Sequence, residues 1–321
     1  MQTLFELSQQ YLDLAQQELL SFFDNPDFLF LNHFVLLKNP ISRKKWEFMK
    51  KRIAFTKKIS TVLFISRRES LLEDIKKYDW NTVYKKDICI RVRRDLHPFY
   101  KEIIAAILFP LKKKKINLDT PTTLIEVYLI HDQVYVCQTL YKVHHDFDDR
   151  KAHNRAAQHP SAMHPRITRA MINLALKGKK DALITDPFMG TGGTLLEAHD
   201  MGLKSQGDDI DKWMVVRTKI NLECFHVNTA KVKQQDATKI KKSIAYVVTD
   251  LPYGKMTKNI STHLYKDFFS NLKKILKYRA VICFKDHPKT VQLIKKYFKI
   301  HHTFLIPVHQ SMTRRIVVLE K

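Results

Sequence analysis

The sequence predicts an α/β fold, in which a mostly parallel sheet with helices on both faces follows an α+β half. Apolar, strand-like segments alternate with amphipathic helical segments from residue 182 to the C-terminus, the order typical of a parallel sheet. All seven glycines fall within residues 178–254, where tight turns and close backbone approaches are therefore expected. Residues 1–140 lack this alternation, and a chain of 321 residues is expected to form two or three domains.

The C-terminal half supplies the strands and helices of the predicted parallel sheet. Strands are expected at residues 182–185, 204–210, 230–234, 244–249 and 280–284, and a closing hairpin at 302–308 and 315–319. Helices are expected at residues 194–201, 213–227 and 288–298, and an apolar stripe from Leu264 to Leu276 predicts another, capped by Ser261. Ligands of such sheets bind beyond the carboxyl ends of the strands.

The N-terminal half mixes helices and strands in no repeating order. Helices are expected at residues 10–23 and 100–108, a mostly extended stretch at 28–37 and a strand at 83–92. Residues 124–130 and 134–137 have strand-like patterns around a short polar turn, which predicts a hairpin. The polar, histidine-rich segment from residue 141 to 159 is interpreted as a linker.

The chain is strongly basic, with a net charge of +24. Residues 51–115 alone carry 18 basic and 7 acidic side chains, so the charge is segregated. We interpret this block as a surface for a polyanion, in particular nucleic acid. Solvated lysine faces are the alternative, and the run from Lys112 to Lys115 fits either interpretation equally well.

Location and metal content are predicted from what the sequence lacks. No apolar run approaches the ~18 residues of a membrane span. Residues 1–20 carry no basic side chain, unlike a targeting peptide, so a cytoplasmic location is expected. The four cysteines form no Cys-x-x-Cys pair, and His159 and His164 lack the spacing of a metal site, so no metal is predicted.

A glycine-rich loop, Asp186-Pro-Phe-Met-Gly-Thr-Gly-Gly193, follows the first predicted strand and opens a helix. Glycine lets a backbone adopt positive φ or lie directly against a ligand. Lys-Ser/Thr does not follow the loop, which argues against a P-loop for nucleotide phosphates. The loop is therefore predicted to hold a cofactor, with Asp186 suited to a positively charged group.

Acidic residues also follow the next two predicted strands. Asp209 stands where an α/β nucleotide fold places its ribose-binding carboxylate, although Asp208 and Asp211 flank it and leave the assignment open. Asp236 ends the third strand and is placed to accept a hydrogen bond from an adenine amino group. Singly, each would more often be a cap or turn residue. Together, they predict a site for a nucleoside with a cationic tail and no phosphate.

The motif Asp250-Leu-Pro-Tyr253, closed by Gly254, follows the fourth predicted strand. Here the chain resembles class I S-adenosylmethionine-dependent methyltransferases that act on exocyclic amines of nucleobases. Their motif is Asn/Asp-Pro-Pro-Tyr, and Leu251 replaces the first proline. The resemblance implies that Asp250 and the Leu251 carbonyl accept the hydrogens of the amine. It also implies that Tyr253 stacks on a base that has left its own stack.

Further segments narrow the resemblance to THUMP-domain tRNA (guanosine-10) N2-methyltransferases. The catalytic-half segments are Arg155, His159-Pro-Ser-Ala-Met-His-Pro165, residues 169–175, the 190–194 loop and His309-Gln-Ser-Met-Thr-Arg-Arg315. In the N-terminal half, residues 88–93, 118–121 and 125–128 are more loosely similar to THUMP strands. The implied domains are a ferredoxin-like piece (1–55), an RNA-binding THUMP domain (56–140), a linker (141–160) and a Rossmann-like catalytic domain (161–321). The last would contain a mostly parallel seven-stranded sheet.

The resemblance also implies roles for individual residues. The expected catalytic residues are Asp250, Leu251, Pro252 and Tyr253. S-adenosylmethionine is expected to contact His164, Pro165, Asp186, Phe188, Gly190, Thr191, Gly192, Gly193, Thr194, Asp209, Ile210, Asp236, Ala237 and Asp250. tRNA is expected to contact Arg91, Arg93, Arg94, Lys112, Lys113, Arg155, His309 and Arg314.

Two other functions compete with tRNA guanosine methylation. An N6-adenine methyltransferase acting on RNA or DNA would use the same motif, although the THUMP-like half argues against DNA. A non-catalytic RNA-binding protein would have no need for both the glycine loop and Asp250. Some relatives use a small zinc-binding activator subunit, which is therefore a possible partner besides tRNA. The sequence leaves open whether one or two methyl groups are added.

Overall fold

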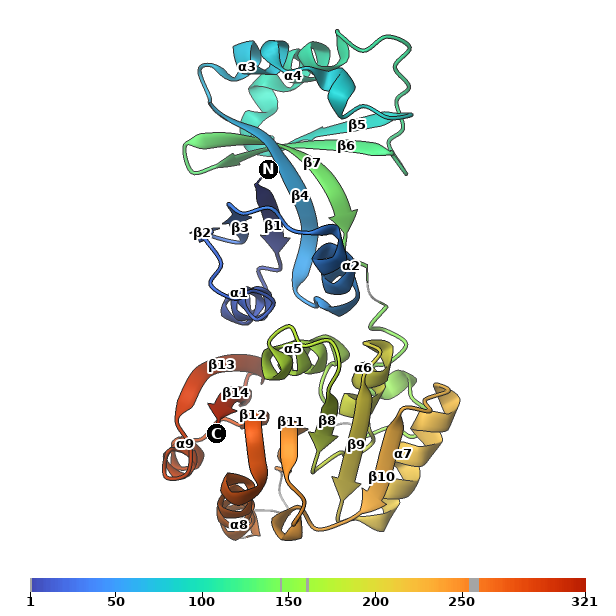
Figure 1. The fold of residues 1–321 in the computed structure, drawn as a ribbon, viewed down its shortest axis with the longest axis vertical. Coiled ribbons are helices and arrows are strands. Elements are labelled where there is room, and N and C mark those ends of the chain that lie inside the picture. The colour runs from blue at the N-terminus through green and yellow to red at the C-terminus, as the bar shows by residue number, and fades with distance from the viewer. Residues whose placement is uncertain (1, 145, 160–161, 254–259) are drawn as a thin grey trace. The chain divides into compact units, whose positions relative to one another are not determined.

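The computed structural model describes residues 2–144, 146–159, 162–253 and 260–321 (Figure 1). They form two compact units. The N-terminal unit comprises Met1–Gln9, Asn25–Trp46 and Thr56–His144, and the C-terminal unit comprises Gln10–Asp24, Glu47–Phe55 and His145–Lys321. Within the described ranges, no helix is both long and apolar enough to cross a membrane.

The N-terminal unit is built on a seven-stranded sheet in the order β2-β3-β1-β4-β7-β6-β5. Its neighbouring strands are antiparallel except for the parallel pair β5 and β6. The strands are β1 (Thr3–Leu7), β2 (Phe28–Leu31), β3 (Phe34–Leu37), β4 (Thr56–Arg67), β5 (Ile88–Val92), β6 (Thr123–Ile130) and β7 (Gln133–Lys142). Because β1 pairs with β4, one sheet runs through both N-terminal pieces predicted from the sequence.

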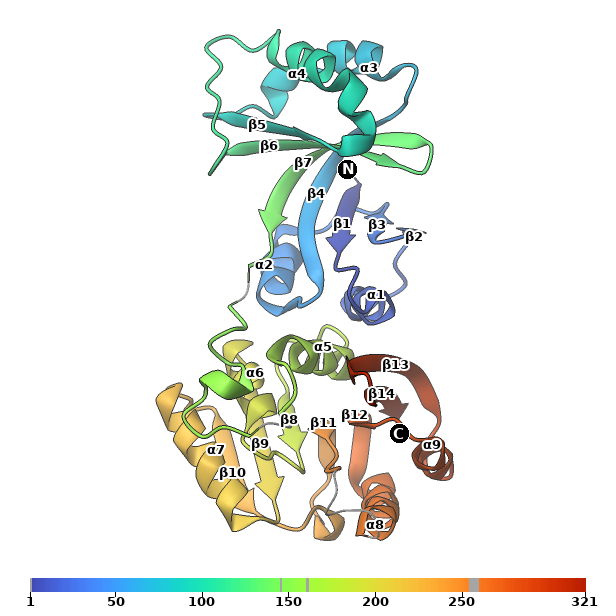
Figure 2. The same cartoon turned by 180° about the vertical axis from the view of Figure 1, so that it is seen from behind.

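Two helices, α3 (Leu71–Lys77) and α4 (Tyr100–Leu108), lie on the same side of β5, β6 and β7 in both opposite views (Figures 1 and 2). The core between them contains Trp80, Ile103 and Val136, all completely buried. The helix predicted at residues 100–108 and the hairpin of β6 and β7 are confirmed. The predicted strand at 83–92 is shorter, because β5 begins only at Ile88.

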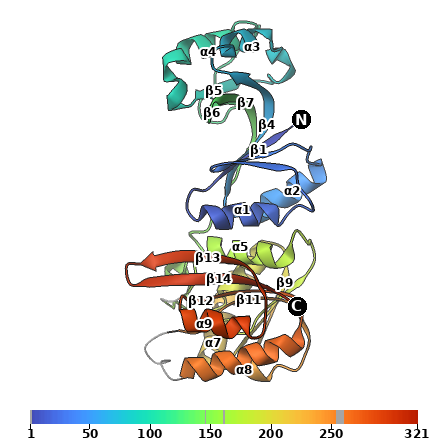
Figure 3. The same cartoon turned by 90° about the vertical axis from the view of Figure 1, so that its left-hand side faces the viewer.

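The C-terminal unit contains a second seven-stranded sheet, in the order β10-β9-β8-β11-β12-β14-β13. Strands β8 to β12 are parallel, whereas β14 is antiparallel to β12 and forms a long hairpin with β13 (Figure 3). The strands are β8 (Leu183–Asp186), β9 (Lys204–Asp209), β10 (Ala230–Gln234), β11 (Ile244–Asp250), β12 (Leu276–Lys285), β13 (Ile300–His309) and β14 (Met312–Glu320). The predicted α/β fold with a mostly parallel sheet is confirmed.

Hydrophobic clusters pack helices against this sheet. One cluster joins α8 and α9 to β11, β12 and β14, and the other lies around α6 and α7. The helices are α5 (Pro165–Leu176), α6 (Gly193–Asp200), α7 (Lys212–Cys224), α8 (Ile260–Ile275) and α9 (Pro288–Lys295). Ser261, the predicted cap of α8, lies inside the helix, and Leu276 begins β12 instead of ending the helix.

Helix α1 (Leu12–Leu20) belongs by its contacts to the C-terminal unit. The Glu18 carboxylate is completely buried and accepts hydrogen bonds from the Ala54 and Phe55 amides at 2.8 and 2.7 Å. It also accepts one from Asn173 Nδ2 of α5 at 2.6 Å. This carboxylate therefore joins α1 to the chain before β4 through two backbone amides and to α5 through the side-chain amide of Asn173.

Candidate active site

A cavity of about 370 Å³ opens at the carboxyl ends of β8, β9 and β11 in the C-terminal unit. Among the lining residues are fourteen that the sequence predicted as site residues: Asp186, Phe188, Gly190, Thr191, Gly193, Thr194, Asp209, Ile210, Asp236, Ala237, Asp250, Leu251, Pro252 and Tyr253. The strand order places them together, since parallel strands end at the same edge of a sheet. Gly254 of the predicted motif lies outside the described residues.

The glycine loop reaches the cavity through positive φ angles at two positions, +52° at Gly190 and +84° at Gly192. Helix α7 supports the loop from behind. Thr218 Oγ1 donates to the Gly190 carbonyl at 2.7 Å, and Asn221 Nδ2 donates to the Thr191 carbonyl at 2.9 Å. A Cβ on Gly192 would lie 2.9 Å from Thr218 Cγ2, so glycine is required there by both conformation and space.

Asp186 lies at the end of β8 and is almost completely buried. Its Oδ1 accepts hydrogen bonds from Thr249 Oγ1 at 2.6 Å and from the Phe188 amide at 3.1 Å. Burial nevertheless raises the pKa of Asp186 to about 7. A buried carboxyl of this kind favours a cationic group in the adjoining cavity, because a positive charge would stabilise its ionised form.

The acidic residues after β9 have different roles. Asp209 Oδ2 accepts a hydrogen bond from the Gly190 amide at 3.0 Å, which ties β9 to the glycine loop. Asp211 caps α7 by accepting from the Trp213 amide at 2.8 Å, and both aspartates line the cavity. Asp208 is completely buried and does not line it, because successive side chains of a strand point to opposite faces. Asp236, after β10, accepts hydrogen bonds from Thr238 at the cavity wall.

Asp250, Tyr253 and Arg314 form a hydrogen-bonded cluster at the end of β11. Arg314 Nε donates to Tyr253 Oη at 2.7 Å, and Tyr253 Oη donates to Asp250 Oδ2 at 3.4 Å. Arg314 Nη2 lies 3.7 Å from the same carboxylate oxygen. Burial raises the pKa of Asp250 to about 6, against the opposing charge of Arg314.

The other carboxylate oxygen of Asp250, Oδ1, is buried and accepts no hydrogen bond from a nitrogen or oxygen of the described residues. A buried acceptor without a partner is costly and is expected to receive a donor from a ligand. Nearby, Tyr265 Oη of α8 donates to the Pro252 carbonyl at 2.8 Å. That bond fixes the Leu251-Pro252 backbone beside the free oxygen.

Several predicted site residues lie elsewhere. Within the C-terminal unit, His164 caps α5, and Pro165 and Gly192 are likewise absent from the cavity wall. Arg155 and Arg314, both expected to contact RNA, are only 2% and 7% exposed, so neither is available to a polyanion at the surface. The Arg155 guanidinium instead lies about 3.3 Å from the position of a Cβ on Gly193.

The cavity also includes residues that the sequence did not single out as ligands, among them Met163, Thr168, Met214 and Leu264. Leu264 belongs to the apolar stripe that was interpreted as core, and Met214 follows the cap of α7 by three residues. Met163 lies in the segment flagged by resemblance. Helical periodicity alone does not separate a side chain facing the core from one that faces a ligand.

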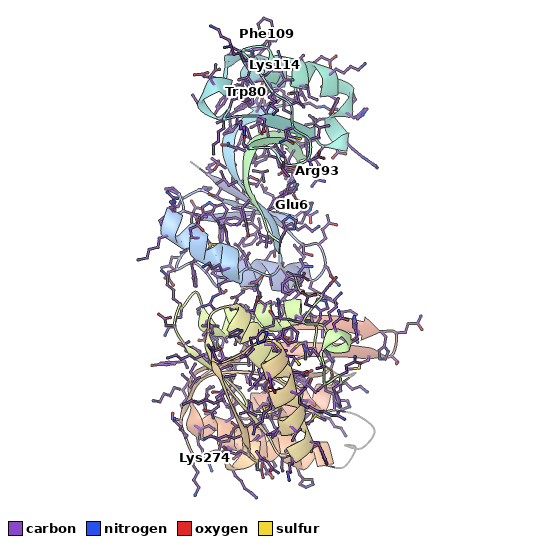
Figure 4. All side chains as sticks on the ribbon, turned by 90° about the vertical axis from the view of Figure 1, so that its right-hand side faces the viewer. Glu6, Trp80, Arg93, Phe109, Lys114 and Lys274 are labelled. Carbon is purple, nitrogen blue, oxygen red and sulfur yellow. The ribbon has the colours of Figure 1, made fainter. Side chains whose placement is uncertain are left out.

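The basic side chains of the N-terminal unit lie mainly on its surface. Arg91, Arg94, Lys112 and Lys113 are exposed, whereas Arg93 is partly engaged by Glu6, whose Oε1 lies 3.0 Å from its Nη2 (Figure 4). Phe109, which is 88% exposed, and Lys114 lie together at one end of this unit. In the C-terminal unit, the exposed His309 ends β13 at the turn to β14.

Comparisons with known proteins identify relatives over most of the chain. A family model described as RMKL-like methyltransferase domain matches residues 152–316, and one described as DNA methylase matches residues 17–218. A tRNA (guanine(10)-N2)-dimethyltransferase of Methanothermobacter thermautotrophicus is 30% identical over 291 residues, covering 87% of this chain and 86% of the relative. Its counterpart from Pyrococcus abyssi is 33% identical, covering 78% and 79% respectively.

Solved structures give the same fold at low sequence identity. TrmN from Thermus thermophilus aligns over the full length of both chains with a TM-score of 0.59 and 15% identity. SMU.472, a methyltransferase solved with SAH, aligns over 98% of this chain and 97% of its own with a TM-score of 0.54 and 15% identity. The likeness extends through the N-terminal as well as the C-terminal unit.

Proposed function

The chain belongs to the family of tRNA (guanine(10)-N2)-dimethyltransferases, and from this premise we propose that it transfers methyl groups to N2 of guanosine 10 in tRNA. The family predicted from the sequence motifs is thereby confirmed. The observation that carries the proposal for this chain is the buried Oδ1 of Asp250, which lies at the wall of the cavity and accepts no hydrogen bond from a nitrogen or oxygen of the described residues. An exocyclic amine supplies the donor that this oxygen lacks.

The methyl donor is S-adenosylmethionine, and the cavity suits it in charge and in hydrogen-bonding groups. We propose that Asp186 holds the cationic amino group, Asp209 or Asp211 the ribose hydroxyls and Asp236 the adenine amine; the support is that all four line the cavity. The glycine loop brings backbone to the cavity with no side chain between. When bound, S-adenosylmethionine supplies a methyl carbon whose bond to the sulfonium sulfur breaks, leaving its electron pair on sulfur, as N2 bonds to carbon.

The residues of the chain prepare the amine for this transfer. The N2 lone pair of guanine is conjugated with the ring and is a poor nucleophile. Asp250 Oδ1 and the Leu251 carbonyl would accept the two amine hydrogens, while the Pro252 carbonyl is already occupied by Tyr265. The proton that leaves N2 passes to Asp250, whose pKa of about 6 suits proton transfer near neutral pH. Tyr253 would stack on the extruded guanine, and fixed geometry supplies much of the rate.

Replacement of Asp250 by alanine tests this assignment. We expect Asp250→Ala to abolish methyl transfer, by at least ~100-fold, and to leave S-adenosylmethionine binding nearly unchanged. Transfer is measured by mass spectrometry of tRNA nucleosides after incubation with enzyme and methyl donor, and binding by calorimetry. A tRNA with guanosine 10 replaced is the control substrate. Wild-type turnover by Asp250→Ala would contradict the proposal.

The same assay separates the alternatives that the sequence left open. The match to the DNA methylase family favours N6-methyladenosine as the second candidate product. If N6-methyladenosine appeared in place of N2-methylguanosine, we would conclude that the enzyme methylates adenine instead of guanine. The names of the relatives support dimethylation, and the ratio of mono- to dimethylated guanosine over time measures it. Absence of heat on adding S-adenosylmethionine would instead indicate a non-catalytic RNA-binding protein.

We further propose that residues 1–55 form the ferredoxin-like piece and residues 56–140 the THUMP domain that holds tRNA. The support is the exposed basic surface of the N-terminal unit, including Arg91, Arg94, Lys112 and Lys113. Basic side chains on a phosphate backbone supply affinity without base recognition, as tRNA recognition by shape requires. The 141–160 segment would connect this part to the catalytic domain at 161–321. We also propose a cytoplasmic location, which a tRNA substrate supports.

A small zinc-binding activator subunit is proposed to dock on the outer face of α7. Trp213 is 71% exposed there, and Val216 and Ile220 continue the apolar stripe at helical spacing. Strand β10 contacts α7 and is the edge strand of the sheet, the kind of position where a partner can pair with backbone groups. The exposed Lys219 and Lys231 favour an acidic partner. Ile220→Glu should prevent co-elution with such a subunit in size-exclusion chromatography, and unchanged co-elution would refute this location.

A further inference from the structure

We propose that Arg314 is a positioning residue for methyl transfer, which keeps Asp250 ionised and holds Tyr253 against it so that Oδ1 alone is offered to the amine. This inference rests on the proposed function, in which Asp250 accepts the proton that leaves the amine. It changes the expected role of Arg314 from an RNA contact to a buried part of the active site.

The geometry of the cluster carries the proposal. The Arg314 guanidinium contacts both partners, through the 2.7 Å hydrogen bond from Nε to Tyr253 Oη and the 3.7 Å approach of Nη2 to Asp250 Oδ2. Its guanidinium carbon also lies 5.5 Å from the centre of the Tyr253 ring. Tyr253 in turn donates to Oδ2. Both interactions of the carboxylate with this cluster therefore fall on Oδ2, while Oδ1 accepts no hydrogen bond from a nitrogen or oxygen of the described residues. The Cys283 thiol also hydrogen-bonds to this carboxyl.

The sheet explains why this arginine reaches the site from so far along the chain. In β14, which runs antiparallel to β12, Arg314 pairs with Lys285 near the carboxyl end of β12. Asp250 pairs with Cys283 of the same strand. Arg314 therefore approaches from the opposite direction to β11. Arg315 points to the other face, where its Nε donates to Asp286 Oδ1 at 2.6 Å.

The charge of Arg314 counteracts other groups around Asp250. Within the described part of the chain, the groups that interact with this carboxyl are Asp186 of β8, Tyr253, Tyr265 of α8, Cys283 of β12 and Arg314 of β14. Arg314 is the cationic member of this set. Burial raises the pKa of Asp250, and the arginine acts against that rise. Loss of the charge should therefore raise the pKa further, by about 1 to 3 pH units.

Arg314→Met tests the inference, and Arg315→Met is the matched control on the opposite face of the same strand. We expect the acid limb of the pH profile of kcat to move to higher pH by about 1 to 3 units in Arg314→Met. The deficit should therefore be large near pH 7 and shrink at higher pH. Arg315→Met should keep the wild-type limb. A deficit that is the same at every pH would show a merely structural role and overturn the proposal.

Arg314→Lys separates charge from geometry. Lysine keeps a positive charge but lacks the planar fork that contacts two partners at once. We expect its acid limb to stay near that of the wild type, while kcat falls at every pH because Tyr253 loses its tether. An acid limb displaced as far as in Arg314→Met would contradict the role of charge. This variant also keeps the inference testable if Arg314→Met does not fold.

A readout without catalysis distinguishes failure of this inference from failure of the proposed function. Infrared difference spectra between wild type and Asp250→Asn isolate the protonated carboxyl band of Asp250, and its pH dependence gives the pKa directly. The titration midpoint of Asp250 should rise when Arg314 is replaced by methionine and should stay at the wild-type value when Arg315 is replaced by methionine. An unchanged midpoint would refute the inference even if tRNA methylation is confirmed. A raised midpoint would support it whatever the substrate.

Discussion

At the residue scale, we expect the buried carboxyl of Asp186 to make cofactor binding depend on pH. In the free protein its pKa is raised by burial to about 7. Below that pKa the Asp186 carboxyl carries a proton in the free protein. If ionised Asp186 pairs with the cationic amino group, cofactor binding releases this proton. Affinity for S-adenosylmethionine should therefore fall as the pH drops below about 7, by up to about tenfold per unit.

Calorimetry at several pH values, in buffers with different heats of ionisation, measures both the affinity and the released protons. Asp186→Asn should bind weakly and without this pH dependence, because an amide does not titrate. Asp236→Asn is the control and should retain it. A wild-type affinity that is constant through the pH range around 7 would exclude Asp186 as the partner of the amino group.

Single residues also show what the sequence was able to predict. Asp186 and Asp250 were found because strand ends and a short motif mark them, and both line the cavity. The burial of Arg155 and Arg314 was not predicted, because arginine in a basic chain suggests surface charge. Arg155 lies beside Gly193, and Arg314 donates to Tyr253, and both neighbours are distant in sequence. Burial of a charge is decided by tertiary partners that no local pattern reports.

At the element scale, α7 acts as a support for the glycine loop, and Gly192 is the position where the two are closest. Gly192→Ala would combine an unfavourable φ with a contact 2.9 Å from Thr218 Cγ2. We expect a loss of about 2 to 4 kcal/mol in the free energy of unfolding and weaker S-adenosylmethionine binding. Urea denaturation and calorimetry measure the two effects.

Gly190→Ala is the matched control, since a Cβ there meets nothing within 4 Å and only the positive φ is strained. Its cost should be about 1 kcal/mol. Adding Thr218→Ser to Gly192→Ala removes the crowded methyl group, keeps the hydroxyl that donates to Gly190 and should restore part of the stability. Equal losses in the two alanine variants would show that space at α7 does not matter.

The elements that the sequence predicted are those with strong periodicity. Strand β10 and helix α4 match their predicted ranges, and β8, β9 and β11 differ by one or two residues at their ends. Helix α2 (Arg43–Arg52) was not predicted, because seven of its ten residues are charged and no apolar stripe marks a face. Strands β1 and β4 were also missed, and they are defined by pairing with each other rather than by flanking turns.

At the scale of the whole molecule, the two units are not continuous segments of the chain. Residues 10–24 and 47–55 belong to the C-terminal unit, although they precede and separate parts of the N-terminal one. The hydrogen bonds of Glu18 explain this division. Its buried carboxylate accepts from the Ala54 and Phe55 amides and from the Asn173 side chain, and these bonds join residues 10–24 and 47–55 to the C-terminal unit. A domain boundary predicted from composition assumes that each domain is one continuous segment of the chain. The predicted boundary near residue 55 therefore could not reveal this exchange of segments.

The chain has a net charge of +24, so its affinity for tRNA should depend strongly on salt concentration. Each lysine that contacts a phosphate contributes about one unit to the slope of log affinity against log salt. The exposed run from Lys112 to Lys115, near Phe109, is the densest basic stretch of the N-terminal unit. Replacing these four lysines by alanine should weaken tRNA binding at low salt and reduce that slope by up to about 4.

Filter binding over a series of salt concentrations measures the slope, and calorimetry with S-adenosylmethionine serves as the control, since these lysines do not line the cavity. Phosphate contacts act on every tRNA alike, so tRNAs with and without guanosine 10 should lose affinity equally. Substitution of Lys241 and Lys242, exposed lysines of the C-terminal unit, matches part of the change in net charge. If the slope changed equally per lysine in the 112–115 variant and in the Lys241 and Lys242 variant, binding would depend on overall charge. That result would refute a specific role for residues 112–115.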